Sequence, residues 1–150
     1  MQQNQLILNE ITVQYKPVKN KKGAIKCSSS AFNNAINFFN LDTIQMQEQF
    51  VILYLNRSNE VIGGYRHSNG GITSTIADIR IILSIALKVL ATGIVLCHNH
   101  PSGGLKPSQA DKNLTQKMKA AANYMDISIV DHLIVSNTQS YYSFSDEGIL

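Results

Sequence analysis

Apolar and polar residues alternate along this chain in blocks, and the spacing within each block indicates a strand or a helix. Runs rich in β-branched and aromatic residues, bounded by turn residues, predict strands. Six such runs lie at residues 5–15, 49–55, 61–67, 92–97, 127–135 and 141–144. The turn Asn56-Arg57-Ser58-Asn59 between the second and third runs predicts a β-hairpin.

Three other segments repeat their apolar residues every three or four positions, which predicts amphipathic helices. They lie at residues 28–39, 76–91 and 108–124. Ser74 or Thr75 is expected to cap the second helix. The polar stripe of this helix consists of Arg80, Ser84 and Lys88, so the rest of its aliphatic surface is expected to pack deeply against a sheet.

The order of these elements places strands beside helices without a repeated strand-helix-strand period. This order predicts an α/β (α+β) fold, a three-layer sandwich with a mixed β-sheet. The length of 150 residues suits one domain, and 44% hydrophobic with 15% charged residues indicates a globular chain rather than a disordered one. We expect residues 1–27 to form a strand and a basic linker, and residues 28–150 to form the domain.

The formal net charge of +3 is too small to indicate a nucleic-acid-binding protein by itself. Five lysines are nevertheless concentrated between Lys16 and Lys26. This basic stretch has two interpretations, a solvated linker or a patch for an anionic partner such as nucleic acid. Aromatic residues do not interleave these lysines, which argues against base stacking.

Cys27 and Cys97 are too few for a disulfide framework, which favours reduced thiols in a cytoplasmic protein. The amino terminus lacks the basic and apolar regions of a signal peptide. The apolar runs are too short to cross a membrane, since a crossing needs ~18 residues. We therefore expect a cytoplasmic protein with no membrane partner.

Candidate chemistry is concentrated where the run at residues 92–97 ends. His98 and His100 are one residue apart at the end of a predicted strand, so their side chains project to the same side. Prolines and glycines then force a loop, and Ser108 opens the third helix with Asp111 in its first turn. The Asp111 carboxylate can thereby lie close to the two histidines. Two imidazoles and one carboxylate are the protein ligands of a catalytic zinc site, so we predict one Zn2+ per chain.

The residues of this segment resemble a known motif. His98-x-His100-Pro101 followed by Pro107-Ser108-x-x-Asp111 is similar to the JAMM metal-binding motif of the JAB/MPN metallopeptidases. The longer string His-Asn-His-Pro-Ser-Gly is similar to the RadC branch of that superfamily. The likeness extends through residues 48–56, 131–135 and 141–144, and it covers roughly residues 28–150. It implies the cytidine-deaminase-like three-layer fold of JAB domains.

The resemblance also implies roles for residues outside the ligand set. The family has a glutamate at the start of an early strand that acts as the base on the metal-bound water, and Glu48 matches it. Glu60 is the competitor, but it lies in the predicted hairpin turn. Ser108 would steady the oxyanion of the intermediate, although Ser108 and Asp111 also match a helix capping box, and both roles can hold. For His132 we expect a hydrogen-bonded position behind the ligands or in the core.

These features predict a zinc-dependent hydrolase of the RadC and JAMM type, which cleaves a peptide or isopeptide (amide) bond of a peptide or protein substrate with metal-activated water. The alternative is a nucleic-acid-associated accessory protein of DNA repair or of mobile elements, without hydrolase activity, that uses the stretch from Lys16 to Lys26. The RadC branch carries a DNA-repair label, but its usual helical amino-terminal region is missing from this sequence, so we expect a solitary catalytic module. An inactive scaffold is disfavoured because all three ligands are present.

Overall fold

A five-stranded β-sheet forms the centre of the protein in the computed structural model, which describes residues 23–70, 77–136 and 140–150. The strand order is β2-β1-β3-β4-β5. The strands are β1 (Gln49–Leu55), β2 (Val61–Asn69), β3 (Gly93–Asn99), β4 (Ser128–Val135) and β5 (Tyr141–Ser143). The helices are α1 (Ser28–Ala35), α2 (Ile79–Lys88) and α3 (Gln109–Asn123), and a short 3-10 helix η1 (Ile36–Phe38) extends α1. The strand predicted at residues 5–15 and the lysines between 16 and 22 lie outside the described residues.

β1 and β2 form the predicted hairpin. Asn59 has a φ of 57°, and the Asn56 side-chain oxygen accepts hydrogen bonds from the N–H groups of Ser58 and Glu60 at 2.9 and 3.0 Å. Asparagine suits both positions, because it tolerates a left-handed backbone and its side chain binds the backbone of its own turn. β1 also pairs antiparallel with β3 along its other edge, so it lies inside the sheet and all its residues are buried.

β3 and β4 run parallel, and α3 forms the crossover between them. A parallel pair needs such a crossover because the chain must return to the same end of the sheet before the second strand starts. The crossover begins with residues 100–108, which join the end of β3 to the start of α3. The loop that carries the predicted ligands therefore lies at the carboxyl end of β3.

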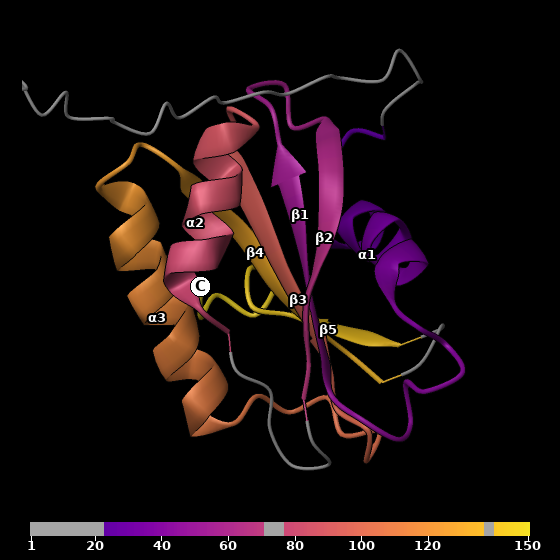
Figure 1. The fold of residues 1–150 in the computed structure, drawn as a ribbon. Coiled ribbons are helices and arrows are strands. Elements are labelled where there is room, and N and C mark those ends of the chain that lie inside the picture. Colours follow the sequence, from indigo (N-terminus) through magenta and orange to yellow (C-terminus); the bar gives the residue numbers. More distant parts are fainter. Residues whose placement is uncertain (1–22, 71–76, 137–139) are drawn as a thin grey trace, which may run out of the picture.

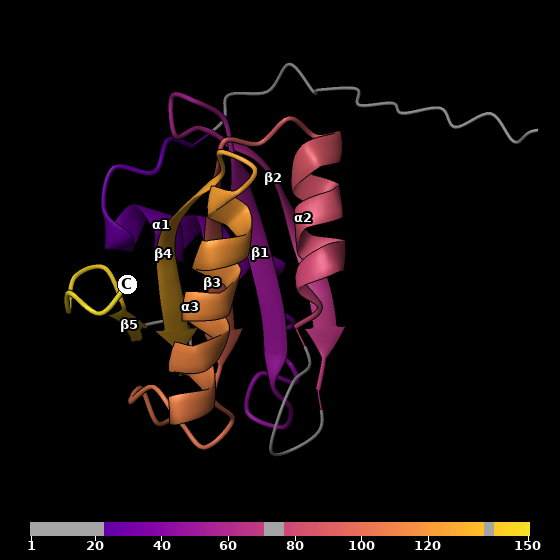
Figure 2. The ribbon, with the colours of Figure 1, turned by 90° about the vertical axis from the view of Figure 1, so that its left-hand side faces the viewer.

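Helices cover both faces of the sheet and give the protein three layers. Figure 1 shows α2 and α3 on one side of the sheet and α1 on the other, and the turned view in Figure 2 agrees. The strand residues alternate between two apolar cores. Leu53 and Leu133 pack in the core under α1, whereas Ile52 and Leu96 pack in the core under α2 and α3. The predicted three-layer sandwich with a mixed β-sheet is confirmed.

The start of α2 differs from the prediction. The helix begins at Ile79, and Asp78 is its N-cap, whose carboxylate accepts a hydrogen bond from the Arg80 N–H at 2.9 Å. The predicted cap at Ser74 or Thr75 is therefore wrong, although these two residues themselves lie outside the described residues. Aspartate is as good a capping residue as serine, and Asp78 stands directly before the aliphatic run.

α2 is also less deeply buried than its composition suggests. The polar stripe of Arg80, Ser84 and Lys88 is exposed, as predicted. Ile81 and Leu87 are also 44% and 50% exposed, so part of the aliphatic surface faces outward rather than toward the sheet. Within residues 23–70, 77–136 and 140–150, none of the helices combines the length and hydropathy that a bilayer crossing requires.

Contacts with the sheet begin before α1. Ala24 forms an isolated antiparallel bridge with Glu60, and the N–H of Ile25 donates to the carbonyl of Asn59 at 2.8 Å. Ile25 itself is buried in the core under α1. The segment that precedes α1 is thereby attached to the β1–β2 hairpin.

Candidate metal centre

β3 carries the first predicted ligand, His98. Side chains alternate along the strand, so Cys97 packs in the core under α1 and His98 points to the opposite face of the sheet. The His98 ring stacks on Phe50, a residue of the core under α2 and α3, with ring centroids 5.9 Å apart. Only 1% of His98 is exposed. Cys97 faces away from His98 and takes no part in the cluster.

His100 follows the last residue of β3 and starts a tight loop. Its N–H donates to the carbonyl of Val135 on β4 at 3.2 Å, which keeps it attached to the sheet. The N–H of Gly103 donates to the His100 carbonyl at 2.9 Å, and Gly103 has a φ of 81°, a left-handed conformation that favours glycine. The turn places the Gly104 carbonyl 2.7 Å from Nδ1 of His100. This contact orients the ring, and Nε2 faces His98.

Asp111 lies in the first turn of α3, where a capping box holds it. The Ser108 hydroxyl oxygen accepts from the Asp111 N–H at 3.1 Å, and the Asp111 carboxylate accepts from the Ser108 N–H at 2.7 Å. The Ser108 hydroxyl also donates to Oδ2 of Asp111 at 2.7 Å. The predicted capping box is confirmed, and it fixes the position of the carboxylate that extends toward the histidines.

The three predicted ligands meet at one place. Nε2 of His98 lies 3.0 Å from Nε2 of His100 and 3.2 Å from Oδ1 of Asp111. Nε2 of His100 lies 3.6 Å from Oδ2 of Asp111. One ligand atom from each residue lies within 4.8 Å of the others, so the group could hold a metal ion. A strand end, a loop and a helix start thus supply one ligand each.

The donors and acceptors of this cluster fit a cation. Nδ1 of His100 faces a carbonyl oxygen, which can only accept, so the neutral ring carries its proton on Nδ1 and leaves Nε2 as a lone pair. That lone pair faces Nε2 of His98 and the Asp111 carboxylate, which are also acceptors when unprotonated. Imidazole nitrogens and a carboxylate are suitable ligands for a divalent transition metal.

The same contacts shift the pKa values of the ligands. The hydrogen bond with Asp111 is the largest cause of the raised pKa of His100. Burial alone would raise the pKa of the Asp111 carboxyl, but the hydrogen bonds that His100 and His98 donate to it when they are protonated, together with the Ser108 hydroxyl, lower that pKa well below its ordinary value. Asp111 is therefore ionised at neutral pH, which is the form that binds a metal.

Glu48 lies at the edge of the cluster. It immediately precedes β1, and the antiparallel register pairs Phe50 with His98, so the start of β1 lies beside the end of β3 that carries the ligands. Its charge contributes to the raised pKa of His100, after the larger effect of Asp111. The competing Glu60 lies at the other end of β1, where its carboxylate accepts from the Asn56 side chain at 2.7 Å. Of the two glutamates only Glu48 is near the predicted ligands, and its role as the base stays a prediction.

Asn99, between the two histidines, supports the segment that leads to Glu48. Its side-chain oxygen accepts from the Gln49 N–H at 2.6 Å. Its side-chain nitrogen donates to the carbonyls of Ile44 and Gln47 at 2.6 and 3.0 Å. Asn99 is fully buried, so it braces the residues before β1 against the end of β3.

His132 on β4 lies directly behind His98. Nε2 of His132 is 2.9 Å from Nδ1 of His98, and Nδ1 of His132 is 2.6 Å from the hydroxyl oxygen of Thr115 on α3. His132 is fully buried, and this burial is the largest cause of a pKa well below the ordinary value for histidine. His132 therefore has the hydrogen-bonded position behind the ligands that was expected. Thr115 was missed, although its place one helical turn after Asp111 is visible in the sequence.

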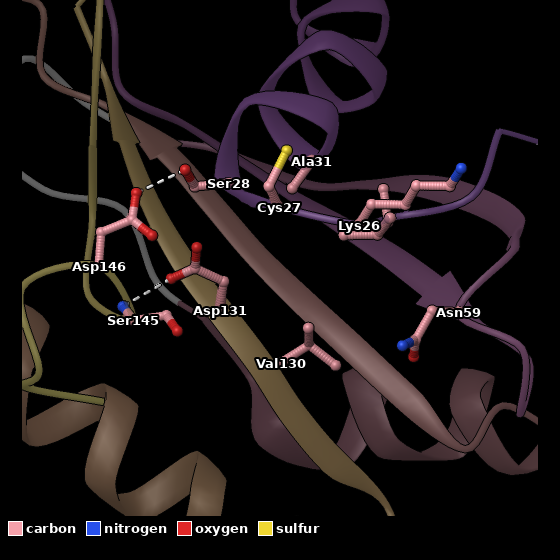
Figure 3. A pocket seen from close by; sticks show the side chains of 10 residues that line it. Lys26, Cys27, Ser28, Ala31, Asn59, Val130, Asp131, Ser145 and Asp146 are labelled. Atoms are coloured by element: carbon pink, nitrogen blue, oxygen red, sulfur yellow. Dashed lines mark hydrogen bonds between the residues drawn. The ribbon is translucent and has the colours of Figure 1, made fainter.

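A concave region lies on the face of the sheet opposite the His98 cluster. It has a volume of about 390 Å³, and Figure 3 shows Cys27, Asp131 and Asp146 among the side chains that line it. The Ser145 N–H donates to the Asp131 carboxylate at 3.0 Å, one of the two contacts drawn there. The residues of the His98 cluster do not line this region, so the two sites are separate.

A mixed sheet between helices, with two histidines and an aspartate gathered at the carboxyl end of β3, defines a JAB-type domain with a candidate metal site. The chain belongs to the RadC family, since residues 25–149 match the family model described as a RadC-like JAB domain. This match confirms the resemblance inferred from the motif.

Curated relatives agree with the family assignment. The chain is 54% identical over 102 residues to a UPF0758 protein of Flavobacterium johnsoniae, an alignment that covers 68% of this chain and 44% of the relative. It is 43% identical over 104 residues to the UPF0758 protein YfjY of Escherichia coli K12, covering 69% and 64% of the two chains. A UPF0758 protein of Porphyromonas gingivalis is 43% identical over 104 residues, covering 69% of this chain and 46% of the relative. The matched region spans about half the length of most of these relatives.

Proposed function

We propose that this protein is a metal-dependent hydrolase that cleaves an amide bond of a peptide or protein, either a peptide bond or an isopeptide bond. The observation that carries the proposal is the convergence of Nε2 of His98, Nε2 of His100 and the Asp111 carboxylate. Three protein ligands are typical of catalytic zinc sites, whereas structural zinc sites almost always have four. The proposal therefore assigns His98, His100 and Asp111 as the ligands of one Zn2+.

When bound, zinc supplies Lewis-acid activation of water and of the substrate carbonyl. The ligand residues contribute the geometry. Ser108 and the first turn of α3 hold the Asp111 carboxylate, and the Gly104 carbonyl holds the His100 ring. Because both orienting contacts are formed within the protein, the ligands need little rearrangement to bind a cation.

Glu48 is assigned the proton transfer, and Ser108 is assigned the contact with the oxyanion. The Glu48 carboxylate accepts a proton from the attacking water and later returns it to the leaving amine, so that a neutral amine departs. The Ser108 hydroxyl turns from Asp111 toward the oxygen on which negative charge develops and donates a hydrogen bond to it. Ser108 is exposed, which leaves its hydroxyl accessible to a substrate.

A reducing, cytoplasmic compartment belongs to the same proposal. Cys27 and Cys97 are both free, and Cys27 is exposed. Two free thiols in one chain are ordinary in a compartment that keeps thiols reduced. The alternative of a nucleic-acid accessory protein depends on lysines that lie outside the described residues, apart from the exposed Lys26.

The test combines metal content with peptide cleavage. Metal content is measured by elemental analysis, and cleavage is followed by mass spectrometry on a complex peptide library, with and without a chelator. The wild-type protein is expected to hold one zinc per chain and to cleave in a chelator-sensitive manner. His98→Ala and Asp111→Ala are expected to lose both properties.

Glu48→Gln is the decisive variant, since it changes the base and none of the three ligands. It is expected to retain one zinc per chain and to lose cleavage. Glu60→Gln is the matched control, because Glu60 lies at the opposite end of β1. Full activity in Glu48→Gln would remove Glu48 from the mechanism, and a wild-type protein that binds no zinc would overturn the proposed function as a whole.

A further inference from the structure

A continuous line of hydrogen bonds leads from α3 to His98 behind the predicted ligands. The Thr115 hydroxyl donates to the backbone carbonyl of Asp111 at 2.7 Å. The hydroxyl oxygen lies 2.6 Å from Nδ1 of His132, and Nε2 of His132 lies 2.9 Å from Nδ1 of His98. Thr115 and His132 are fully buried, and His98 is 1% exposed. We call Thr115, His132 and His98 the relay.

The Asp111 carbonyl, which accepts from Thr115, determines which ring nitrogen of His132 and of His98 carries the proton. A carbonyl oxygen cannot donate, so Thr115 uses its one hydroxyl proton on Asp111 and can only accept from His132. Neutral His132 must then carry its proton on Nδ1, which leaves Nε2 as an acceptor. His98 therefore donates from Nδ1, and its Nε2 is a lone pair. With the opposite assignment, Nε2 of His98 would carry a proton and could not bind a cation.

We propose that Thr115 and His132 are positioning residues that hold His98 in the tautomer able to bind the metal through Nε2. This inference rests on the proposed metal site. It gives α3 a double function, because the same helix supplies the ligand Asp111 and, one turn later, the hydroxyl that sets the tautomer of a second ligand. Hydrogen bonds to the second nitrogen of a metal-binding histidine are known to raise metal affinity.

The surroundings of the relay keep water out. Phe50 stacks on His98 with centroids 5.9 Å apart, and Phe144 stacks on His132 with centroids 4.6 Å apart. Both phenylalanines are essentially fully buried. The ring nitrogens consequently have to find their partners within the protein, and a change at Thr115 cannot be repaired by solvent.

A purely structural role for Thr115 makes a different prediction. Valine has nearly the shape of threonine and lacks only the hydroxyl, so Thr115→Val would satisfy a packing requirement. It would also leave Nδ1 of His132 without an acceptor, and both tautomers of the two rings would then be populated. Thr115→Ser keeps the hydroxyl and loses a methyl group. The two variants therefore separate hydrogen bonding from packing.

The first measurement is the tautomer itself, read in the metal-free protein. In wild-type protein labelled with ¹⁵N-histidine, NMR is expected to show His98 protonated on Nδ1 with an unprotonated Nε2. Thr115→Val is expected to show a mixture of tautomers, and Thr115→Ser is expected to match the wild type. A wild-type His98 that carries its proton on Nε2, or an unchanged tautomer in Thr115→Val, would overturn the proposal.

The second measurement is zinc affinity, determined by competition with a chelator of known affinity. Loss of a residue of this type typically costs about 10- to 100-fold in metal affinity, and we expect a loss in this range for Thr115→Val. Thr115→Ser is expected to stay within about threefold of the wild type, since the hydroxyl is kept. Equal affinities of the valine variant and the wild type would contradict the relay.

His132 offers an independent pair of variants. His132→Gln keeps an oxygen that can accept from Nδ1 of His98, whereas His132→Leu keeps no acceptor. Zinc affinity is expected to fall more in the leucine variant, and thermal unfolding of the metal-free proteins reports whether both fold. If His132→Leu does not fold, the threonine pair still decides the question. A wild-type protein without zinc affinity would end the proposed function, whereas an intact zinc site that is indifferent to Thr115 would end the relay alone.

Discussion

The two faces of β4 carry two buried polar networks that are completed in different ways. Asp131 and His132 are neighbours in the sequence, so their side chains point to opposite faces of the sheet. On the α1 side, the Asp131 carboxylate accepts from the N–H groups of His132 and Ser145 at 2.7 and 3.0 Å and from the Ser143 hydroxyl at 2.6 Å. Both carboxylate oxygens have donors from within the protein.

On the opposite face, the cluster of His98, His100 and Asp111 contains more hydrogen-bond acceptors than donors. The relay and the Gly104 carbonyl direct both histidine protons away from the cluster, so two lone pairs and a carboxylate face one another. A network in which donors and acceptors match stabilises the fold by itself. A cluster of acceptors is instead stabilised by a cation, so it is suited to binding a metal ion.

Zinc should stabilise the folded protein by binding at the His98 cluster. At a free zinc concentration 100 times the Kd, binding stabilises a folded protein by about 2.7 kcal/mol. For a chain of this size the corresponding rise in Tm is roughly 5–10 °C. Scanning calorimetry with and without zinc measures this rise, and Asp111→Asn is expected to abolish it. An equal rise in both proteins would show that zinc acts elsewhere.

On the α1 side, removal of the acceptor should cost stability without affecting the metal. Asp131→Ala leaves two backbone N–H groups and a hydroxyl without their partner, and we expect a loss of about 2–3 kcal/mol in the free energy of unfolding. Urea denaturation measures this loss. Asp131→Asn keeps one oxygen acceptor and is expected to lose less. Zinc affinity should stay close to that of the wild type in both variants, and a large fall would mean that the two faces are coupled through β4.

Two helix caps provide a smaller and closely matched test. Ser108→Ala and Asp78→Ala each remove an N-cap, and each is expected to cost about 1 kcal/mol in the free energy of unfolding. Only Ser108 also donates to the ligand Asp111. Zinc affinity should therefore fall in Ser108→Ala and stay unchanged in Asp78→Ala. If zinc affinity is unchanged in both variants, Ser108 acts only as a helix cap and does not support the metal site.

The smallest effect concerns reactivity rather than stability. A hydrogen bond from Ser29, followed by contacts with Ser30, lowers the pKa of the exposed Cys27 thiol from 9.0 to about 7. The thiolate is the reactive form and accumulates as the pH rises through the pKa, so the alkylation rate of Cys27 should reach half its maximum near pH 7. Alkylation rates measured with iodoacetamide at pH values below and above 7 test this pKa. Ser29→Ala should raise the pH at which the rate is half its maximum.

Cys97 is the internal control for that experiment. Burial raises the pKa of its thiol well above the ordinary value, and the residue is fully buried. It should resist alkylation in the folded protein at every pH at which Cys27 reacts. Modification of Cys97 at a comparable rate would indicate that the core under α1 opens readily.

Much of the fold follows from local patterns. β1 was predicted with the observed limits, because its β-rich run is bounded by turn residues, and Asn56 and Asn59 marked the hairpin. The α3 start was predicted from Ser108 and Asp111, because a capping box is a contact within four residues. The cap of α2 was misplaced, since several residues before that helix are capable of capping and only the folded chain selects Asp78.

For the site, the ligand types and their spacing could be predicted without coordinates, since the residues from His98 to Asp111 form one continuous segment whose strand, loop and helix start obey local rules. The residues that surround these ligands come from distant parts of the chain and could not be predicted in this way. The register between β1 and β3 pairs Phe50 with His98 and so brings the start of β1, which Glu48 precedes, to the end of β3, and His132 lies behind His98 because β4 pairs with β3 in parallel. Such neighbours depend on strand order and on long-range packing, which no local pattern encodes.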